Sequence, residues 1–214
     1  PQTLAAIYTS DFSSGLYGAS SYPDFVDFRN QADTFDDIAA YASTTLNTTS
    51  DPEPAPHRGV LVTGNYFDVL GVKPLLGRAF TAQESAWNGP KVVMLGYALW
   101  ERRFNRDPTI VGTSLVINDA PHTVVGVLPA SFDFATVFAP GSRFDLYFPF
   151  PLSPETNRWG NTMAMIGRLK PGVTLDQAQN EMNVIGARLT QQYPDFNTNW
   201  GINVVPVRTQ FSGD

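Results

Sequence analysis

The segment from Thr174 to Leu189 constrains the fold more than any other part of the sequence. Thr174 and Gln177 have the spacing of a capping box, in which each side chain bonds the other residue's backbone N–H at the start of a helix. Apolar residues then recur at intervals of three and four, at Leu175, Ala178, Met182, Ile185 and Leu189. This stripe predicts an amphipathic helix that covers a sheet, because a lone helix cannot bury such a face. The alternative is that the stripe docks a partner helix.

A second helix is predicted over residues 21–35. Ser21 and Asp24 repeat the capping-box spacing, and Pro23 suits the first helical turn. The apolar side chains that follow keep a roughly helical spacing, at Phe25, Phe28, Ala32 and Phe35. This helix also needs a sheet to cover.

Short apolar runs predict the strands of that sheet. They lie at residues 1–9, 38–42, 60–63, 145–148, 163–169 and 202–207. Residues 65–70 predict a short helix that ends at Gly71, since glycine adopts the left-handed cap easily. The Pro-containing stretch 44–56 predicts a loop or a hairpin tip. The fold class predicted by this alternation is α+β.

The middle of the chain has a different sequence pattern, in which short predicted elements are separated by turn residues. It predicts a strand at 92–95, a helix at 97–104 and a hairpin made of 115–117 and 123–127. Trp100, Phe104 and Phe132 can anchor a small separate core. We therefore predict two lobes: an α+β lobe made of residues 1–76 and 144–214, and a mostly β lobe inserted at residues 77–143.

Composition excludes some classes of function. The net charge is −6 and no basic tract is present, which disfavours nucleic-acid binding. The chain has no cysteine, so disulfides, thiolate metal sites and a cysteine nucleophile are absent. No apolar run reaches the ~20 residues that span a bilayer. Because the sequence starts at Pro1 without a methionine, we expect it to be part of a longer chain, with membrane helices just before Pro1 and soon after Asp214.

No catalytic or metal-binding motif stands out. The two histidines, His57 and His122, lack metal-ligand spacing and are predicted to be surface residues. The acidic pairs Asp24 with Asp27, and Asp36 with Asp37, are predicted to lie on solvated faces. The sequence has neither a G-x-S-x-G elbow nor a P-loop. We therefore expect no enzymatic activity, no cofactor and no metal in this domain.

Four sequence motifs follow one another along the chain. They are residues 62–72 with 76–80, residues 92–104 with 110–112, residues 122–129, and residues 167–175. In this order they resemble the MacB-like periplasmic core domain of ABC transporter permeases. The run at residues 21–29 makes the chain similar to the first core domain of large permeases of acidobacteria and related bacteria. The motif positions, all interpreted as structural, are Gly64, Tyr66, Phe67, Leu70, Gly71, Gly77, Arg78, Trp100, Phe104, Gly112, Gly126, Pro129, Arg168, Pro171 and Gly172.

The resemblance implies a place and a role. Such domains lie on the extracytoplasmic side of the bacterial cytoplasmic membrane, between the first and second membrane helices of the permease. They have a porter-like lobe built from both chain ends and a variable inserted lobe. A cytoplasmic ATPase drives the permease, which we expect to act as a dimer, sometimes with a periplasmic partner protein. The expected role is to relay ATP-driven motion outward; the alternative is a module that binds or senses a peptide, lipid or drug.

Overall fold

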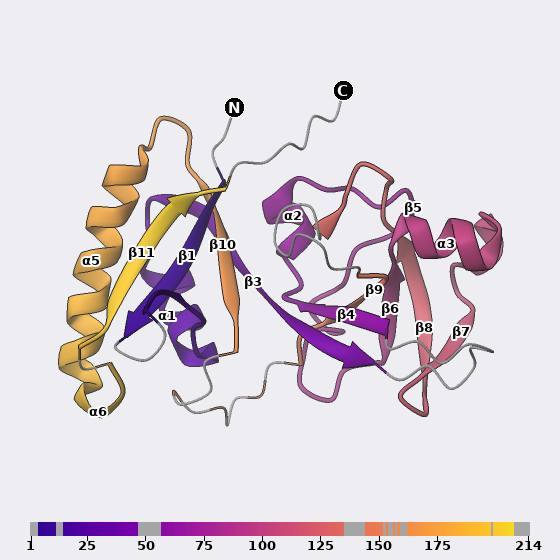
Figure 1. Cartoon of the computed structure of the whole chain (residues 1–214), viewed down its shortest axis with the longest axis horizontal. Coiled ribbons are helices and arrows are strands. Elements are labelled where there is room, and N and C mark those ends of the chain that lie inside the picture. The colour runs from indigo at the N-terminus through magenta and orange to yellow at the C-terminus, as the bar shows by residue number, and fades with distance from the viewer. Residues whose placement is uncertain are drawn as a thin grey trace. The chain divides into compact units, whose positions relative to one another are not determined.

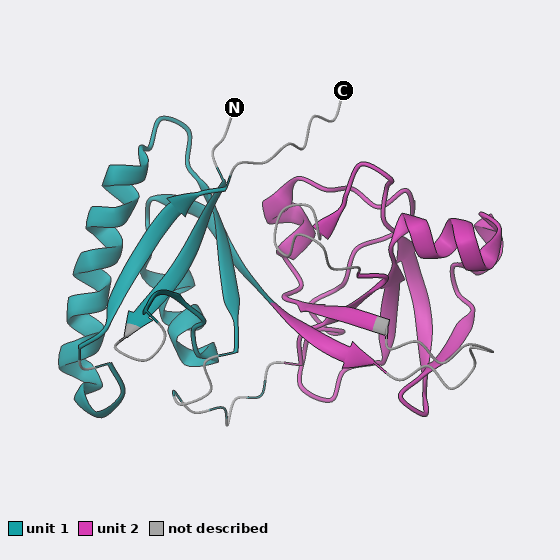
Figure 2. Cartoon of the chain, in the orientation of Figure 1, with its two compact units in different colours: residues 1–41, 153–208 teal, residues 42–152, 209–214 magenta. Residues whose placement is uncertain are grey.

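The computed structural model describes residues 4–11, 15–46, 57–134, 144–151, 153, 156, 158, 162–197 and 199–207. Within these residues the chain forms two compact units (Figure 2). Unit 1 contains the described residues up to 41 and from 153 onward, and unit 2 contains those between 42 and 152. Helices and strands alternate in sequence, so the predicted α+β class is confirmed.

Unit 1 contains a sheet with the strand order β11–β1–β10–β3, in which every neighbouring pair is antiparallel (Figure 1). Its strands are β1 (Leu4–Asp11), β3 (Phe35–Leu46), β10 (Ala164–Leu169) and β11 (Gly201–Pro206). The short strand β2 (Gly15–Gly18) pairs with the end of β1. In the chain, helix α1 follows β1 and β2 and leads into β3, and helix α5 connects β10 to β11. This is the split βαβ arrangement of ferredoxin-like folds.

The two long helices of unit 1 begin where the sequence predicts. The Ser21 hydroxyl accepts a hydrogen bond from the Asp24 backbone N–H at the start of α1 (Tyr22–Gln31). Both halves of the predicted capping box are present at Thr174, where α5 (Leu175–Gln192) begins. The buried face of α5 packs on β11, so the stripe covers the sheet as predicted. The short helix α6 (Pro194–Asn197) follows.

Helix α1 is shorter than predicted. It ends at Gln31, and Ala32 already has extended backbone angles. Phe35 begins β3 instead, and its ring lies so close to Gly167 of β10 that a Cβ there would be 2.4 Å from the ring. The ring occupies the space that a side chain at 167 would need, which fixes Phe35 in the sheet rather than on the helix.

Unit 2 contains a mixed sheet. From the end of β3 its order is β4–β9–β6–β8, and both β5 and β7 pair along β8. The strands are β4 (His57–Val62), β5 (Leu76–Gly77), β6 (Val92–Leu95), β7 (Ser114–Ile117), β8 (Ala120–Val127) and β9 (Leu146–Pro149). The pairs β4 with β9 and β6 with β8 are parallel, whereas β7 and β8 form the predicted antiparallel hairpin.

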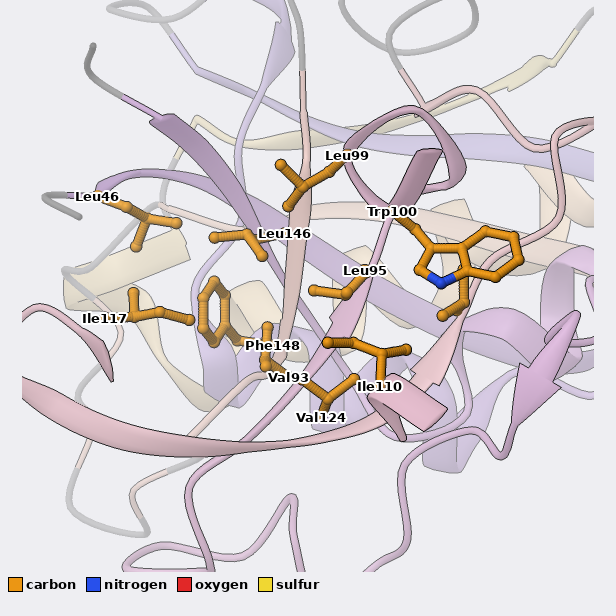
Figure 3. Close-up of a cluster of buried hydrophobic side chains, with 11 residues drawn as sticks. Leu46, Val93, Leu95, Leu99, Trp100, Ile110, Ile117, Val124, Leu146 and Phe148 are labelled. Carbon is orange, nitrogen blue, oxygen red and sulfur yellow. The ribbon is translucent and has the colours of Figure 1, made fainter. Parts of the chain in front are cut away.

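The core of unit 2 lies against the central strand β6, whose four residues are all buried. Helix α3 (Tyr97–Phe104) adds Leu99 and Trp100 to a cluster that also holds Ile117 and Phe148, drawn in Figure 3. Helix α2 (Tyr66–Leu70) and the 3-10 turn η1 (Pro108–Ile110) also belong to this unit.

The two units divide at other positions than the sequence predicts. Residues 42–76 and 144–151 belong to unit 2, not to the lobe built from the chain ends. The reason is strand pairing: β4 and β9 run parallel to each other, and β9 also pairs with β6. The backbone groups of β4 and β9 therefore form their hydrogen bonds within the sheet of unit 2. The first three residues of the predicted loop at 44–56 belong to β3, which continues to Leu46, and residues 47–56 lie outside the described residues.

Candidate functional site

The motif residues of α2 form the centre of an aromatic cluster in unit 2. Tyr66 and Phe67 are fully buried, and Leu70 is nearly so. The Phe67 ring lies 5.8 Å from that of Phe132 and 6.0 Å from that of Tyr147, both edge-on. Gly71 ends the helix at φ 71°, the left-handed cap that the sequence predicts. This cluster packs the unit and offers no reactive group.

Two motif glycines allow β5 to approach β8. Gly77 and Gly126 face each other in register. A Cβ on Gly77 would lie 2.2 Å from the Val125 carbonyl oxygen, and one on Gly126 would lie 2.6 Å from the Arg78 carbonyl oxygen. Both contacts are too close for any side chain, so the pair must be glycine for the strands to meet.

Arg78 holds the loop that follows β5. Its guanidinium donates to both carboxylate oxygens of Glu84, at 2.9 and 2.7 Å. Glu84 is buried and also accepts the Thr81 backbone N–H at 2.8 Å. The hydrogen bonds from Arg78 are the largest cause of a lowered pKa for Glu84. Arg78 is therefore part of a charged clamp on residues 78–84.

The other motif residues lie in two separate places. In unit 2, Trp100 donates from Nε1 to the Asp107 carbonyl at 2.8 Å, and the partly buried Phe104 packs against the cluster that contains Trp100. The remaining members of unit 2 are loop or turn residues: Gly64, Gly112 and Pro129. In unit 1, Arg168 lies in β10, and Pro171 and Gly172 form the turn before α5. The motif residues thus do not converge on one site.

An ion-pair network in unit 1 corrects the prediction for Asp24. Asp24 is buried, not solvated, and its Oδ1 accepts from Arg158 at 2.5 Å and from Asn197 at 3.2 Å. Arg158 also pairs with Asp27, and its guanidinium lies 3.7 Å from the centroid of the Tyr193 ring. The network joins α1 to α6 and the end of α5. No local sequence pattern reveals this network, because Arg158 lies 134 positions from Asp24.

His122 is a partly buried residue of β8 rather than a fully exposed one. Its Nδ1 lies 2.9 Å from the Ala120 carbonyl oxygen, which can only accept, so Nδ1 carries the proton. The ring meets the Phe148 ring edge-on at 5.5 Å. Burial lowers the pKa of His122, so the imidazole is neutral at pH 7. The side chain of His57 lies outside what the structure describes.

A groove of about 400 Å³ opens in unit 2. Leu46, Ile117 and Phe148 contribute apolar surface, and Trp87, Lys91 and His122 line it as well. Sequence reasoning missed Trp87 and Lys91, although an indole in a turn rich in Asn, Gly and Pro is an available signal. In the described part of the chain, no cluster of His, Cys, Asp or Glu could hold a metal ion, and no helix is long and apolar enough to cross a membrane.

The comparisons with known proteins decide the family. The model of the MacB-like periplasmic core domain matches residues 2–185. The chain belongs to this family. It is accordingly an extracytoplasmic domain of a MacB-like ABC transporter permease, a class of transporter that also has membrane and ATPase components. The assignment to acidobacterial permeases stays a prediction.

Solved structures share the fold of this family. The periplasmic region of MacB from Actinobacillus actinomycetemcomitans is 16% identical, with a TM-score of 0.64, and the match covers 94% of this chain and 88% of that one. The extracellular domain of the noncanonic ABC-type transporter YknZ from Gram-positive bacteria is 14% identical, with a TM-score of 0.62, covering 94% and 99%. No curated protein matches the chain.

Proposed function

We propose that this MacB-like core domain is a non-catalytic relay, which passes ATP-driven motion from the membrane part of the permease to its extracytoplasmic side. The observation that supports this most is the position of the first and last described strands. β1 and β11 are antiparallel neighbours, with Ala5 opposite Pro206. The Val207 N–H donates to the Leu4 carbonyl oxygen at 2.9 Å, so both ends of the described chain are held together in unit 1.

The connection between the units suits a relay. Strand β3 is a single strand of 12 residues that begins in unit 1 and continues into unit 2. In unit 1 it is bonded to β10 from Phe35 to Tyr41, and beyond that it pairs with β4. A displacement of the β1–β11 pair would thus reach unit 2 through a hydrogen-bonded strand rather than through a free linker. In the complete transporter we expect two such permeases, with membrane helices joined to both ends of this domain.

Spin labels can test the relay without knowledge of the substrate. Ala98 on α3 and Ala187 on α5 are exposed, and they lie in different units. On a cysteine-free permease assembled with its ATPase in lipid, both are changed to cysteine and labelled. ATP should shift the distance between these labels but not the distance between labels at Ala98 and Asp68, both in unit 2. An unchanged distance between the units would contradict the relay.

The absence of catalysis is a separate part of the proposal. Calorimetric titration of the chain with ATP and with Zn²⁺ should give no binding heat, because no phosphate loop or metal-ligand spacing occurs in the sequence. Micromolar ATP binding or stoichiometric zinc would contradict it.

The second candidate is a module that binds or senses a ligand on the same scaffold. The groove of unit 2 is the observation that favours it, since a concave, mostly apolar surface with a few polar groups is typical of ligand sites. A relay and a ligand site are compatible in one domain.

A further inference from the structure

The groove of unit 2 has an apolar floor that is already part of the core. Leu46, Ile117 and Phe148 are each more than nine-tenths buried and belong to one cluster. In Figure 3 the Ile117 side chain points toward the Phe148 ring. Because these side chains pack on each other, the floor is formed before any ligand arrives. A preformed apolar surface of this kind favours apolar ligand groups through the hydrophobic effect.

The rim of the groove carries an exposed indole. Trp87 is 53% exposed, in a unit whose other large aromatic residues are mostly buried. The clamp formed by Arg78 and Glu84 holds the start of the same loop, three residues before Trp87. A large apolar ring exposed on an anchored loop beside a groove can cover a ligand at low entropic cost.

The rim also carries a positive charge. Lys91 lines the groove and is exposed, and among the described residues no carboxylate forms an ion pair with it. Among the described residues that line the groove, the carboxylate belongs to Glu84, which already accepts two hydrogen bonds from Arg78 and one from the Thr81 backbone. His122, which also lines the groove, is neutral at pH 7. In a chain of net charge −6, the described lining of the groove therefore presents the Lys91 ammonium, a cation that can meet an anion.

We propose that this groove binds an amphiphilic anion: one apolar chain that lies on the floor formed by Leu46, Ile117 and Phe148, under Trp87, with a single carboxylate at Lys91. The apolar part of the ligand would supply most of the affinity, and Lys91 would make the groove selective for an anionic head group. The site lies wholly within unit 2, so it depends neither on the relay nor on how the units move.

Decanoate, kept below its micelle concentration, is the probe. Binding to the purified chain is followed by calorimetry and by amide and indole N–H shifts in NMR spectra. Octanoate should bind about fifteenfold more weakly, since it lacks two methylenes and each buried methylene contributes roughly 0.8 kcal/mol. Decanol and decyltrimethylammonium share the apolar chain but lack the anion, and both should bind more weakly than decanoate. The shifts should concentrate at residues 86–92, 117–122 and 148–149.

Two variants test the assigned residues. Lys91→Gln should weaken decanoate binding about threefold to fivefold, the effect of one partly exposed charge, and leave decanol unchanged. Trp87→Ala should weaken both. Both side chains are exposed, so neither change removes core packing. The matched controls are Lys170→Gln and Leu75→Ala, which are exposed and lie outside the groove, and these should bind as the native chain does.

Other results would overturn the proposal. It is wrong if decanoate does not bind up to its micelle concentration, or if the cationic amphiphile binds as well as the anion. It is also wrong if the shifts map to another surface, or if Lys91→Gln and Trp87→Ala bind decanoate with native affinity. None of these results would bear on the relay, which the spin-label distances test separately.

Discussion

At the scale of single residues, the charged contacts matter more than the sequence suggests. The sequence marks Arg78 only as a motif position, and the structure gives it a partner, Glu84, six positions further along the chain. The sequence predicts a solvated Asp24, whereas in the structure Asp24 is buried and paired with Arg158. Glu84 is close to Arg78 in sequence, but the spacing of the two residues is not distinctive. Arg158 is far from Asp24 in sequence, so no local pattern could reveal that ion pair.

Replacing Arg78 by alanine should destabilise the chain by about 1–3 kcal/mol, because the buried Glu84 carboxylate would lose its main partner. The lowered pKa of Glu84 stabilises the folded chain above pH 4.5, and this contribution is lost as the pH falls through the lowered value. Urea unfolding at pH 7 and pH 4 measures both effects. The Arg78→Ala penalty should be smaller at the lower pH; equal penalties would contradict the clamp. Lys73→Ala, an exposed change in the same unit, should cost less than about 0.5 kcal/mol.

His122 predicts a second pH dependence. Burial lowers its pKa below 6.5, so protonation opposes folding, and stability should fall as the pH falls through 6.5 towards the lowered value. His122→Gln removes this titration. The stability of the native chain relative to the variant should therefore decrease between pH 7.5 and pH 5 in unfolding curves. A constant difference would show that the imidazole is not disfavoured in its charged form.

At the scale of elements, the local signals predicted the helices and the hairpin well. The capping box at Thr174 and the left-handed cap at Gly71 depend on residues close in sequence, so the local sequence is enough to predict them. The parallel pairing of β4 with β9 joins segments about 87 positions apart, Gly59 with Leu146, and no local pattern specifies it. The lobe boundary was misplaced for this reason. The groove was missed as well, because its walls come from β3, β9, the β7–β8 hairpin and a loop.

The edge of strand β11 has a side-chain partner that the sequence does not reveal. Gln179 of α5 accepts the Val204 N–H and donates to the Ile202 carbonyl oxygen, both at 2.8 Å. Its amide thus occupies the place of a neighbouring strand and blocks the edge.

Gln179→Ala should lower the free energy of unfolding by about 1–2 kcal/mol, the sum of two hydrogen bonds. It should also increase self-association, because the open edge can pair with another chain. Urea unfolding and light scattering after size exclusion measure these effects. Asn180→Ala, at the exposed neighbouring position, serves as the control. If the two variants behave alike, the edge is not protected by Gln179.

At the scale of the whole molecule, the family could be predicted from the order of four sequence motifs, and the family model confirms it over residues 2–185. The division into two units was foreseen only in outline, since strand pairing across the chain decides which segments fold together. The role as a relay rests on two features of the described chain: the paired end strands, and β3 as the strand that enters both units.

The most direct test of the relay is the ATP-dependent distance between labels at positions 98 and 187, measured in the native permease and in one with a flexible Gly-Gly-Ser insertion after Tyr41. The insertion interrupts β3 where unit 2 begins. If the domain is a relay, ATP should shift the distance in the native permease, and the insertion should abolish this shift while ATP hydrolysis continues. The relay is contradicted if ATP leaves the distance in the native permease unchanged. It is also contradicted if the insertion variant shows the same ATP-dependent shift as the native permease.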